Sequence, residues 1–290
     1  MQDVHFLALD GGGTGCRAMI CGADGRELGR AVGGGANLTS DFEAACENIL
    51  ATISNAYEDA GLQAGAMSSG MAVLGVAGAE IGDCANRLQD RLDFAKLRVL
   101  SDRDTAIAGV LGEEDGTLAQ IGTGSFFVTR RAGVTRHAGG WGLVLGDECS
   151  GAWLGRELLR TTLRAQDGLE DGSGLTETVL SAFSNNPEAI ILSAQTASPA
   201  DFAAYAPQLF SACEGGDGVA HRILHQAVQQ LEQTLTVLEA GSRLPLYLCG
   251  GVGERYTKII GKAFRDRVVK PKGDSLSGAL SLAMALHREK

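Results

Sequence analysis

The chain has 290 residues, 44% of them hydrophobic and 5% aromatic, with 41 glycines and a formal net charge of −10. This composition supports a real core and is typical of an α/β protein with many tight turns, which argues against a disordered or fibrous chain. An acidic chain without a basic block also argues against nucleic acid or an anionic membrane as a partner.

The cysteines and the N-terminus bear on where the protein works. The seven cysteines are scattered, without a C-x-x-C pair, at positions 16, 21, 46, 84, 149, 213 and 249. An odd number of dispersed thiols fits a reducing compartment and signals no zinc or iron–sulfur site. Residues 1–5 contain no basic segment, and no apolar run approaches the ~20 residues of a membrane span. We therefore expect a cytoplasmic protein with no membrane partner.

The first predicted element is a buried strand over residues 4–9, which ends in Asp10, three glycines and Thr14. A second apolar run, 16–21, follows at once and predicts a hairpin with a tip of bare backbone. Such N–H groups suit a polyphosphate because no Cβ keeps its oxygens away. Asp10 offers an oxygen for magnesium or a magnesium-bound water. The alternative is an ordinary glycine-rich turn; neither a Walker loop nor a Gly-x-Gly-x-x-Gly spacing is present.

The rest of the first half alternates helices and strands. A glycine loop leads to Asn37, and Ser40 with Glu43 predicts a capping box for a helix that ends at Gly61. Asp102 directly follows the last predicted strand. The expected elements after the hairpin are a strand at 27–32, a helix at 41–60, a strand at 71–76, a helix at 81–92, a strand at 97–100 and a helix at 105–111.

The pattern then begins again. A strand at 117–121 runs into Gly122-Thr123-Gly124-Ser125, and a later strand at 244–248 runs into Gly250-Gly251. The other expected elements are strands at 126–129 and 133–137, a helix at 149–164, a mostly helical insert at 166–216, a helix at 217–240, a helix at 254–264, a short strand at 268–269 and a helix at 275–287.

Both halves therefore predict the order βββαβαβα, each with a glycine-rich tip on its first hairpin. We expect an α/β protein of two ribonuclease H-like domains, 1–112 and 113–290, with a hinge near 113–116 and a cleft between them. The insert at 166–216 belongs to the second domain, and the alternative for the last helix, 275–290, is that it packs back on the first. Two glycine hairpins aimed at one cleft would clamp a triphosphate.

The order and spacing of these motifs resemble a known family. They are Asp10-Gly11-Gly12-Gly13-Thr14, Gly35-Ala36-Asn37, Ser101-Asp102, Asp115-Gly116, Gly122-Thr123-Gly124-Ser125, Gly140-Trp141-Gly142, Gly146-Asp147-Glu148-x-Ser150-Gly151-x-Trp153 and Gly250-Gly251-Val252. The chain resembles the N-acetylglucosamine/glucosamine kinases of the BadF/BadG/BcrA/BcrD ATPase family, within the sugar kinase, actin and hexokinase superfamily. The resemblance covers nearly the whole chain and is weakest over 166–216.

The resemblance implies ATP and Mg²⁺ as cofactors, a small amino sugar as substrate and a homodimer. ATP phosphates would be held by Gly11, Gly12, Gly13, Thr14, Thr123, Gly124 and Ser125, and the adenosine side by Gly250 and Gly251. Sugar hydroxyls would be held by Asn37, Thr123, Gly140 and Asp147. Asp102 would be the catalytic base, and Asp104 is not constant in the family. Eukaryotic members often carry a cysteine where this chain has Ala138.

Each site residue also has a structural alternative. Asp102 could be a helix N-cap, and Asp147 and Glu148 could be favourable charges at a helix N-terminus. Asn37 could be a turn residue. Trp141 and Trp153 are more typical of core anchors than of sugar-stacking platforms. Two further histidines, His221 and His225, lack a third metal ligand nearby.

Three functions fit the motifs to different degrees. The leading one is an ATP-dependent kinase acting on the 6-hydroxyl of glucosamine or N-acetylglucosamine, between which the sequence does not choose. The first alternative is an ATPase activator of an acyl-CoA dehydratase, which needs cysteines at an interface to hold an iron–sulfur cluster. The second is a non-catalytic sugar sensor, which would lack the base that Asp102 supplies.

Overall fold

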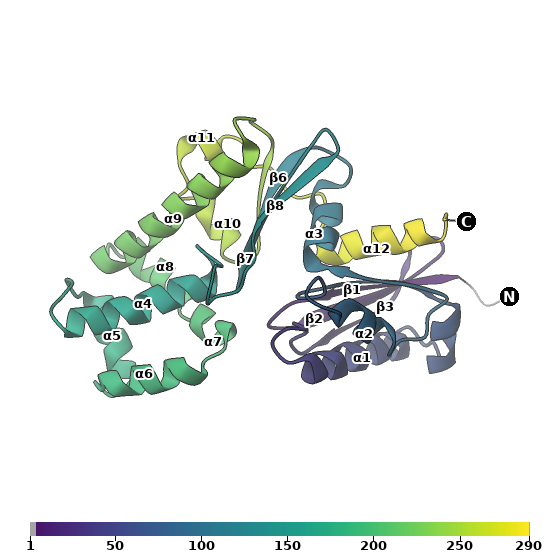
Figure 1. Ribbon diagram of the computed structural model, residues 1–290, viewed down its shortest axis with the longest axis horizontal. Coiled ribbons are helices and arrows are strands. Elements are labelled where there is room, and N and C mark those ends of the chain that lie inside the picture. The colour runs from purple at the N-terminus through teal and green to yellow at the C-terminus, as the bar shows by residue number, and fades with distance from the viewer. Residues whose placement is uncertain (1–3, 290) are drawn as a thin grey trace. The chain divides into compact units, whose positions relative to one another are not determined.

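The computed structural model describes residues 4–289 as two compact units (Figure 1). Unit 1 runs up to Glu114 and resumes at Pro271, and unit 2 spans Asp115–Lys270. Residues 1–3, part of the segment expected to contain no basic run, and residue 290, the expected end of the last helix, lie outside the described residues. Over residues 4–289, no helix combines the length and the apolar character that a membrane crossing requires.

Unit 1 is built on a mixed five-stranded sheet of order β3-β2-β1-β4-β5. The strands are β1 (His5–Gly11), β2 (Cys16–Gly22), β3 (Glu27–Gly33), β4 (Met71–Val76) and β5 (Lys96–Ser101). The first three form an antiparallel meander, and β4 and β5 run parallel to β1. The apolar run that predicted β1 is explained by burial on both faces, since Leu7 and Leu9 belong to one core and Phe6 and Ala8 to the other.

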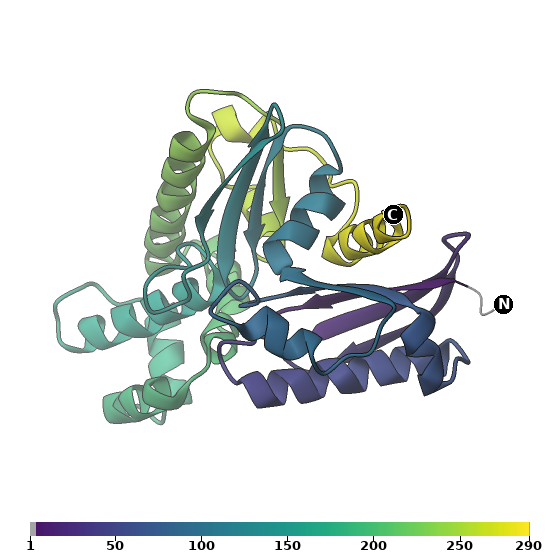
Figure 2. The ribbon, with the colours of Figure 1, turned by 45° about the vertical axis from the view of Figure 1, so that its right-hand side comes forward.

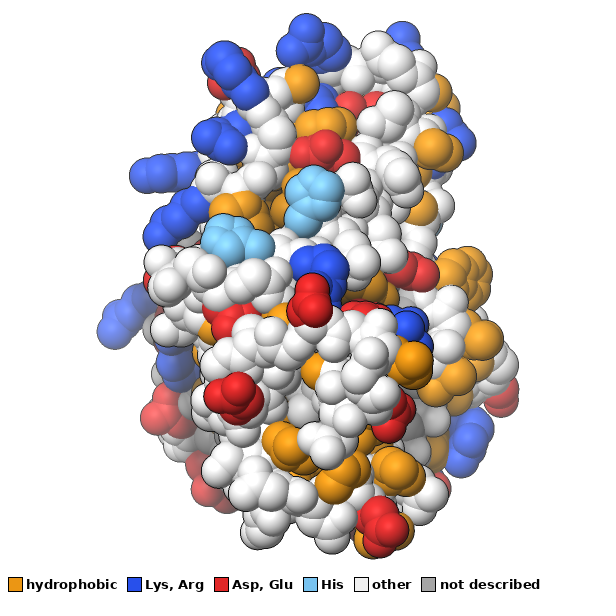
Figure 3. All heavy atoms as spheres, turned by 90° about the vertical axis from the view of Figure 1, so that its left-hand side faces the viewer, with side chains coloured by type: hydrophobic (Ala, Val, Ile, Leu, Met, Phe, Trp, Pro, Cys, Tyr) orange, Lys and Arg blue, Asp and Glu red, His pale blue; other side chains and the backbone are white. Residues whose placement is uncertain are grey.

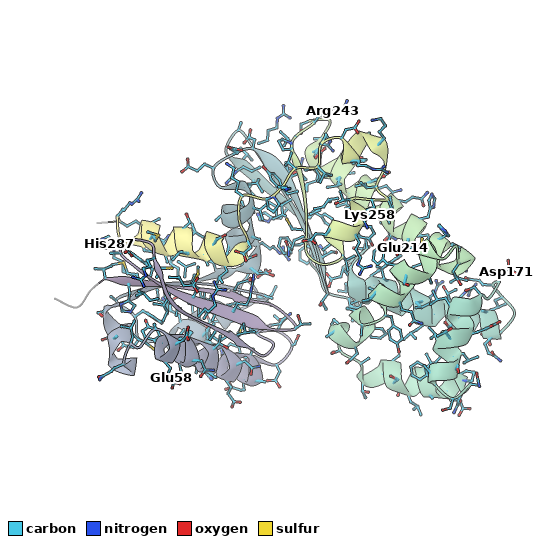
Figure 4. All side chains as sticks on the ribbon, turned by 180° about the vertical axis from the view of Figure 1, so that it is seen from behind. Glu58, Asp171, Glu214, Arg243, Lys258 and His287 are labelled. Atoms are coloured by element: carbon cyan, nitrogen blue, oxygen red, sulfur yellow. The ribbon has the colours of Figure 1, made fainter. Side chains whose placement is uncertain are left out.

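Helices cover both faces of this sheet (Figure 2). Helix α1 (Phe42–Asp59) packs Ile49 and Ile53 against Leu7 and Leu9. Helix α12 (Ser275–Leu286) covers the opposite face, and His287 at its end meets the Phe6 ring edge-on, with centroids 6.0 Å apart (Figure 4). The closing helix therefore belongs to the core of unit 1.

Two helices of unit 1 differ from expectation. The N-cap of α1 is Asp41, whose carboxylate accepts from the Ala44 N–H, so the Ser40/Glu43 capping box is wrong. The helix expected at 81–92 is only α2 (Cys84–Gln89). Its start is delayed because Gly82 has a left-handed φ of 58°, which no helix continues through. The other elements are a 3₁₀ turn at Ala64–Ser69 and α3 (Asp102–Leu111).

Unit 2 has a four-stranded sheet of order β8-β7-β6-β9. Its strands are β6 (Gly116–Ile121), β7 (Ser125–Arg131), β8 (Val134–Gly139) and β9 (Leu246–Cys249). The strand expected at 268–269 is wrong, because only an isolated bridge joins Val268 to Leu246. The Val269 N–H donates to the Leu246 carbonyl, but Pro271, the next residue on that side of the segment, has no N–H to continue the ladder.

Helices surround this second sheet. They are α4 (Gly151–Gln166), α5 (Gly174–Ala182), α6 (Pro187–Thr196), α7 (Pro199–Ala203), α8 (Ala206–Glu214), α9 (Gly218–Glu239), α10 (Gly253–Tyr256) and α11 (Lys262–Arg265). The last two replace the single helix expected at 254–264. Between α4 and α6 lies a hollow of about 550 Å³, with Leu159, Ile190 and Phe202 among its lining residues. Figure 3 shows hydrophobic side chains gathered low on that face, at the level of α6 in Figure 1.

Candidate active site

The first glycine turn joins β1 to β2 at the edge of the unit 1 sheet where the parallel strands end. It is closed by a bond from the Gly12 N–H to the Gly15 carbonyl (2.9 Å), and the Ala36 N–H donates to the Gly12 carbonyl (2.8 Å). A Cβ at Gly35 would lie 2.7 Å from the Gly13 carbonyl oxygen. The second glycine loop is therefore packed directly against the first turn and holds its shape.

The glycines at the tip itself are not required by the fold of the chain. A Cβ at Gly12 would meet no atom closer than 3.9 Å, and one at Gly13 would meet nothing within 4 Å. Neither residue has the left-handed φ that favours glycine. The backbone at this tip is therefore open to close approach, and the fold gives no conformational or packing reason for glycine there.

Asp10 lies beside this turn and is held by an arginine. Arg17 Nη2 is 2.7 Å from Asp10 Oδ2, and Arg17 Nη1 is 3.1 Å from Asp274 Oδ2, at the N-cap of α12. Burial raises the pKa of Asp10, while the bond to Arg17 opposes that shift. One carboxylate fits the way Mg²⁺ is held beside phosphates, with most other ligands being water or phosphate oxygen.

Asn37 follows the glycine loop and makes a local turn. Its Oδ1 accepts from the Thr39 N–H (2.9 Å) and from the Thr39 hydroxyl (2.7 Å). The turn that was its structural alternative is thus present. Because the oxygen is used there, the amide N–H₂ is the group that Asn37 can offer to a sugar oxygen.

Asp102 is the first residue of α3, directly after β5. The N-cap is Ser101, whose hydroxyl accepts from the Arg103 N–H, so the N-cap alternative for Asp102 is wrong. Burial, followed by the charge of Glu80, raises the pKa of Asp102 to about 6, against the opposing effects of Arg103 and Ser101. A carboxyl that ionises near neutral pH can accept a proton from a hydroxyl better than an ordinary aspartate can. Asp104, two residues on, is exposed in the first turn of α3.

Glu80 was not singled out from the sequence, and the structure brings it to the same sheet edge. It follows β4, which is the parallel neighbour of β5, and Arg103 Nη2 lies 3.4 Å from its Oε1. The available signal was a carboxylate soon after a parallel strand, but Glu80 stands four residues past the predicted strand and just before the helix expected at 81–92, which gave no reason to choose it.

The second glycine turn, in unit 2, is docked on a helix. The Gly151 N–H donates to the Gly122 carbonyl (2.8 Å) and the Ala152 N–H to the Thr123 carbonyl (3.0 Å), both from the first turn of α4. The Ser125 hydroxyl donates to the Glu148 carbonyl (2.8 Å). This anchoring fixes the turn that carries Thr123 and Gly124.

Asp147 lies against this second turn. A Cβ at Gly124 would sit 2.7 Å from Asp147 Oδ2, and Asp147 is 8% exposed with a left-handed φ of 55°. The N-cap of α4 is Ser150, so the carboxylate stands at the glycine turn before the helix begins. On the other side of the turn, Gly139 pairs with Phe126, which brings Gly140 next to Ser125. Thr123, Gly140 and Asp147 thus share one edge of unit 2.

Gly250 and Gly251 reach the same edge from β9. Strand β9 runs parallel to β6, with Cys249 opposite Gln120. A Cβ at Gly250 would lie 2.4 Å from the Ile121 carbonyl oxygen, so a glycine is needed for this close approach. Gly251 is exposed.

The two tryptophans differ in burial. Trp153 is 6% exposed and belongs to the core of unit 2, as expected, but Trp141 is 70% exposed, so its role as a core anchor is wrong. The loop from Trp141 to Gly146 closes on itself through a bond from the Gly146 N–H to the Gly142 carbonyl (2.8 Å), which turns Trp141 outward. Over the described residues, no three His, Cys, Asp or Glu side chains gather as metal ligands.

The chain belongs to the BadF/BadG/BcrA/BcrD ATPase family, whose model matches residues 7–280. A glucosamine kinase of Vibrio cholerae is 31% identical over 280 residues, covering 96% of this chain and 95% of the relative. An N-acetyl-D-glucosamine kinase of Dictyostelium discoideum is 26% identical over 286 residues, covering 88% and 87%. A crystal structure of a candidate N-acetylglucosamine kinase from Chromobacterium violaceum matches with a TM-score of 0.90 at 34% identity, covering 98% of this chain and all of that one.

These matches confirm the predicted family and the two-domain α/β fold of the sugar kinases. They also confirm the predicted class of enzyme, an ATP-dependent sugar kinase. The comparisons do not identify the site residues, whose assignment depends on the geometry within each unit.

Proposed function

We propose that this protein is an ATP-dependent amino-sugar kinase that transfers the γ-phosphate to the 6-hydroxyl of glucosamine or N-acetylglucosamine. The observation that carries the proposal is Asp102, a half-buried carboxyl with a pKa of about 6 at the sheet edge that also bears the first glycine turn. The sugar class is supported by the names of the relatives, which are glucosamine and N-acetylglucosamine kinases.

Each site residue takes a role in this proposal. The phosphate chain is bound by Gly11, Gly12, Gly13, Thr14, Thr123, Gly124 and Ser125, and the adenosine side by Gly250 and Gly251. The sugar hydroxyls are bound by Asn37, Thr123, Gly140 and Asp147. The open backbone at Gly12 and Gly13 supports the first set, and the shared edge of Thr123, Gly140 and Asp147 supports the last.

Asp102 acts as the general base. The sugar hydroxyl oxygen attacks the γ-phosphorus, the bond from that phosphorus to the β–γ bridging oxygen breaks, and ADP leaves with the electron pair. The hydroxyl proton passes to Asp102 as the new bond forms. Because the transition state is loose, positioning and charge neutralisation supply most of the rate enhancement.

Asp10 would hold magnesium beside the phosphates. When bound, the ion neutralises charge on the β- and γ-phosphate oxygens. Arg17 binds the Asp10 carboxylate through Oδ2, which leaves Oδ1 for the ion or its water.

The remaining predictions concern the setting of the enzyme. A cytoplasmic location is supported by seven cysteines that are all unpaired thiols. The proposal of a homodimer depends on the resemblance alone. Light scattering coupled to gel filtration measures the oligomeric state.

The proposal is tested by ADP release over a panel of hexoses and amino sugars, with magnesium and with EDTA. We expect magnesium-dependent stimulation by glucosamine or N-acetylglucosamine above all other sugars. Stimulation by glucose alone would contradict the substrate class. Steady ATP turnover that no sugar stimulates would favour the ATPase activator, and binding of sugar without turnover would favour the sensor.

A further inference from the structure

An ion pair stands beside Asp102 at the edge of unit 1. Arg103 directly follows Asp102 in α3, and its Nη2 is 3.4 Å from Glu80 Oε1. The Arg103 side chain is 16% exposed and the Glu80 side chain 36% exposed, so solvent screens this pair less than a fully exposed one.

The fold places this pair by strand register. Strands β4 and β5 are parallel neighbours, with Val76 opposite Ser101, so the segments that follow them leave the sheet side by side. The segment after β4 is held by successive turns, with the Ala79 N–H donating to the Val76 carbonyl and the Ile81 N–H to the Gly78 carbonyl. Glu80 therefore stands on an ordered turn next to the first residues of α3.

We propose that Glu80 is a positioning residue for Asp102: it holds the Arg103 guanidinium and so keeps that cation from pairing with the Asp102 carboxylate. The inference rests on the proposed function, in which Asp102 accepts the proton of the sugar hydroxyl. An arginine paired with this carboxylate would make it a weaker base, because an adjacent cation favours the ionised form. Glu80 thus keeps the base effective.

The charges around Asp102 agree with this role. After burial, the charge of Glu80 is the largest influence that raises the pKa of Asp102, and Arg103 lowers it. Asp10, two strands away in the sheet, raises it further. Helix α12 packs on α3, and Asp274 at its N-cap is bound by Arg17.

Other charged groups on or near α3 lie away from Asp102 or point to solvent. Asp104 lies on the exposed side of the first turn, and the Lys272–Glu114 pair lies at the opposite end of the helix. A single substitution of Glu80 or of Arg103 therefore breaks the ion pair that stands beside Asp102. The competing explanation is that their ion pair only anchors the turn, in which case its loss would change stability and leave the basicity of Asp102 unchanged.

The decisive variant is Glu80→Gln, with Glu43→Gln as its matched control. Glu43 also pairs with an arginine of unit 1, Arg91 (2.8 Å), but it belongs to α1 and does not pair with a residue of α3. Two quantities are measured: the acid limb of kcat/KM for glucosamine against pH, and the titration of the Asp102 carboxyl carbon by NMR, assigned with Asp102→Asn.

In Glu80→Gln we expect the Asp102 titration and the acid limb to move together from about 6 to lower pH, by roughly 0.5–1.5 pH units, the usual scale for one nearby charge. The plateau kcat should fall several-fold, and Glu43→Gln should leave both curves in place. Arg103→Met is the second variant, and it should move the Asp102 titration to higher pH.

An unmoved Asp102 titration in folded Glu80→Gln overturns the inference, and so does a downward shift in Arg103→Met. If Glu80→Gln does not fold, Arg103→Met alone decides. The NMR titration needs no turnover, so a protein that phosphorylates no sugar but shows the expected shifts would contradict the proposed function and leave the electrostatic coupling intact.

Discussion

The two glycine turns are alike in sequence and differ in what surrounds them. In unit 1, a Cβ at Gly13 would meet nothing within 4 Å. In unit 2, a Cβ at Gly124 would lie 2.7 Å from the Asp147 carboxylate, and the turn is bonded to the first turn of α4. The first turn is held from behind by a second glycine loop, and its tip stays open.

This difference separates two reasons for a glycine. At Gly124 the protein itself needs the missing Cβ, because Asp147 occupies that space. At Gly13 neither the backbone conformation nor a neighbouring atom needs it, which agrees with the proposed binding of phosphate there. In the proposed function, the first turn would bind phosphate alone, whereas the second would combine a phosphate-binding backbone with a carboxylate suited to sugar hydroxyls.

The largest expected effect is a difference in catalysis between substitutions of Asp102 in unit 1 and Asp147 in unit 2. Asp102→Asn should lower kcat by roughly 10²–10⁴-fold, the usual scale for loss of a general base, with little change in the dissociation constant of ATP. Asp147→Asn should mainly raise the KM for the sugar. It replaces a carboxylate oxygen that would accept from a sugar hydroxyl, and it leaves the proposed proton acceptor, Asp102, in place. Steady-state kinetics and nucleotide titration of both variants measure these effects.

Asp104→Asn is the control for Asp102→Asn, and its turnover should be near wild type, since it changes only a charge in the first turn of α3. An inactive Asp104→Asn beside an active Asp102→Asn would mean that the wrong aspartate has been chosen as the base.

The next prediction tests the difference between the two glycine turns directly. Gly13→Ala should leave the free energy of unfolding within about 0.5 kcal/mol of wild type while weakening ATP binding roughly 10–100-fold, the scale of one or two lost bonds to a charged ligand. Gly124→Ala should cost about 1–3 kcal/mol of stability, because the new methyl group displaces Asp147. Urea unfolding and nucleotide titration test both, and equal stability losses at the two positions would remove the distinction.

The smallest effect concerns pH and stability. The pKa of Asp102 is about 6 in the folded protein against an ordinary 3.8. The folded state therefore binds more protons between these values, and its stability falls as pH rises through that window. Asp102→Asn should be more stable than wild type by about 1–3 kcal/mol above pH 6 and no more stable below pH 4. Urea unfolding at pH 8 and pH 4 measures the difference, and a constant difference would argue against the raised pKa.

Strong local patterns predicted most of the fold. The strands around both glycine turns, α9 and the insert helices follow from apolar periodicity, because their buried faces are set by nearby residues. The failures depend on tertiary context. The N-cap of α1 is Asp41, one residue later than expected, and the expected strand at 268–269 forms only an isolated bridge, because Pro271 cannot donate the next bond.

The site was harder to complete from sequence. Asp102 could be chosen because it ends an apolar run, and the turn glycines because they stand in series. Glu80 could not, since its importance depends on which strands are neighbours and on the register between β4 and β5. Trp141 was misplaced because apolar character does not reveal whether a loop turns inward or outward.

The central claim is the identity and position of the phosphorylated atom. The most direct measurement is a phosphorus–proton correlation spectrum of the product formed from glucosamine, ATP and magnesium. We predict a correlation from the new phosphate to the two protons on carbon 6. A correlation to the proton on carbon 1 or carbon 3, or inorganic phosphate as the sole new signal, would contradict the account.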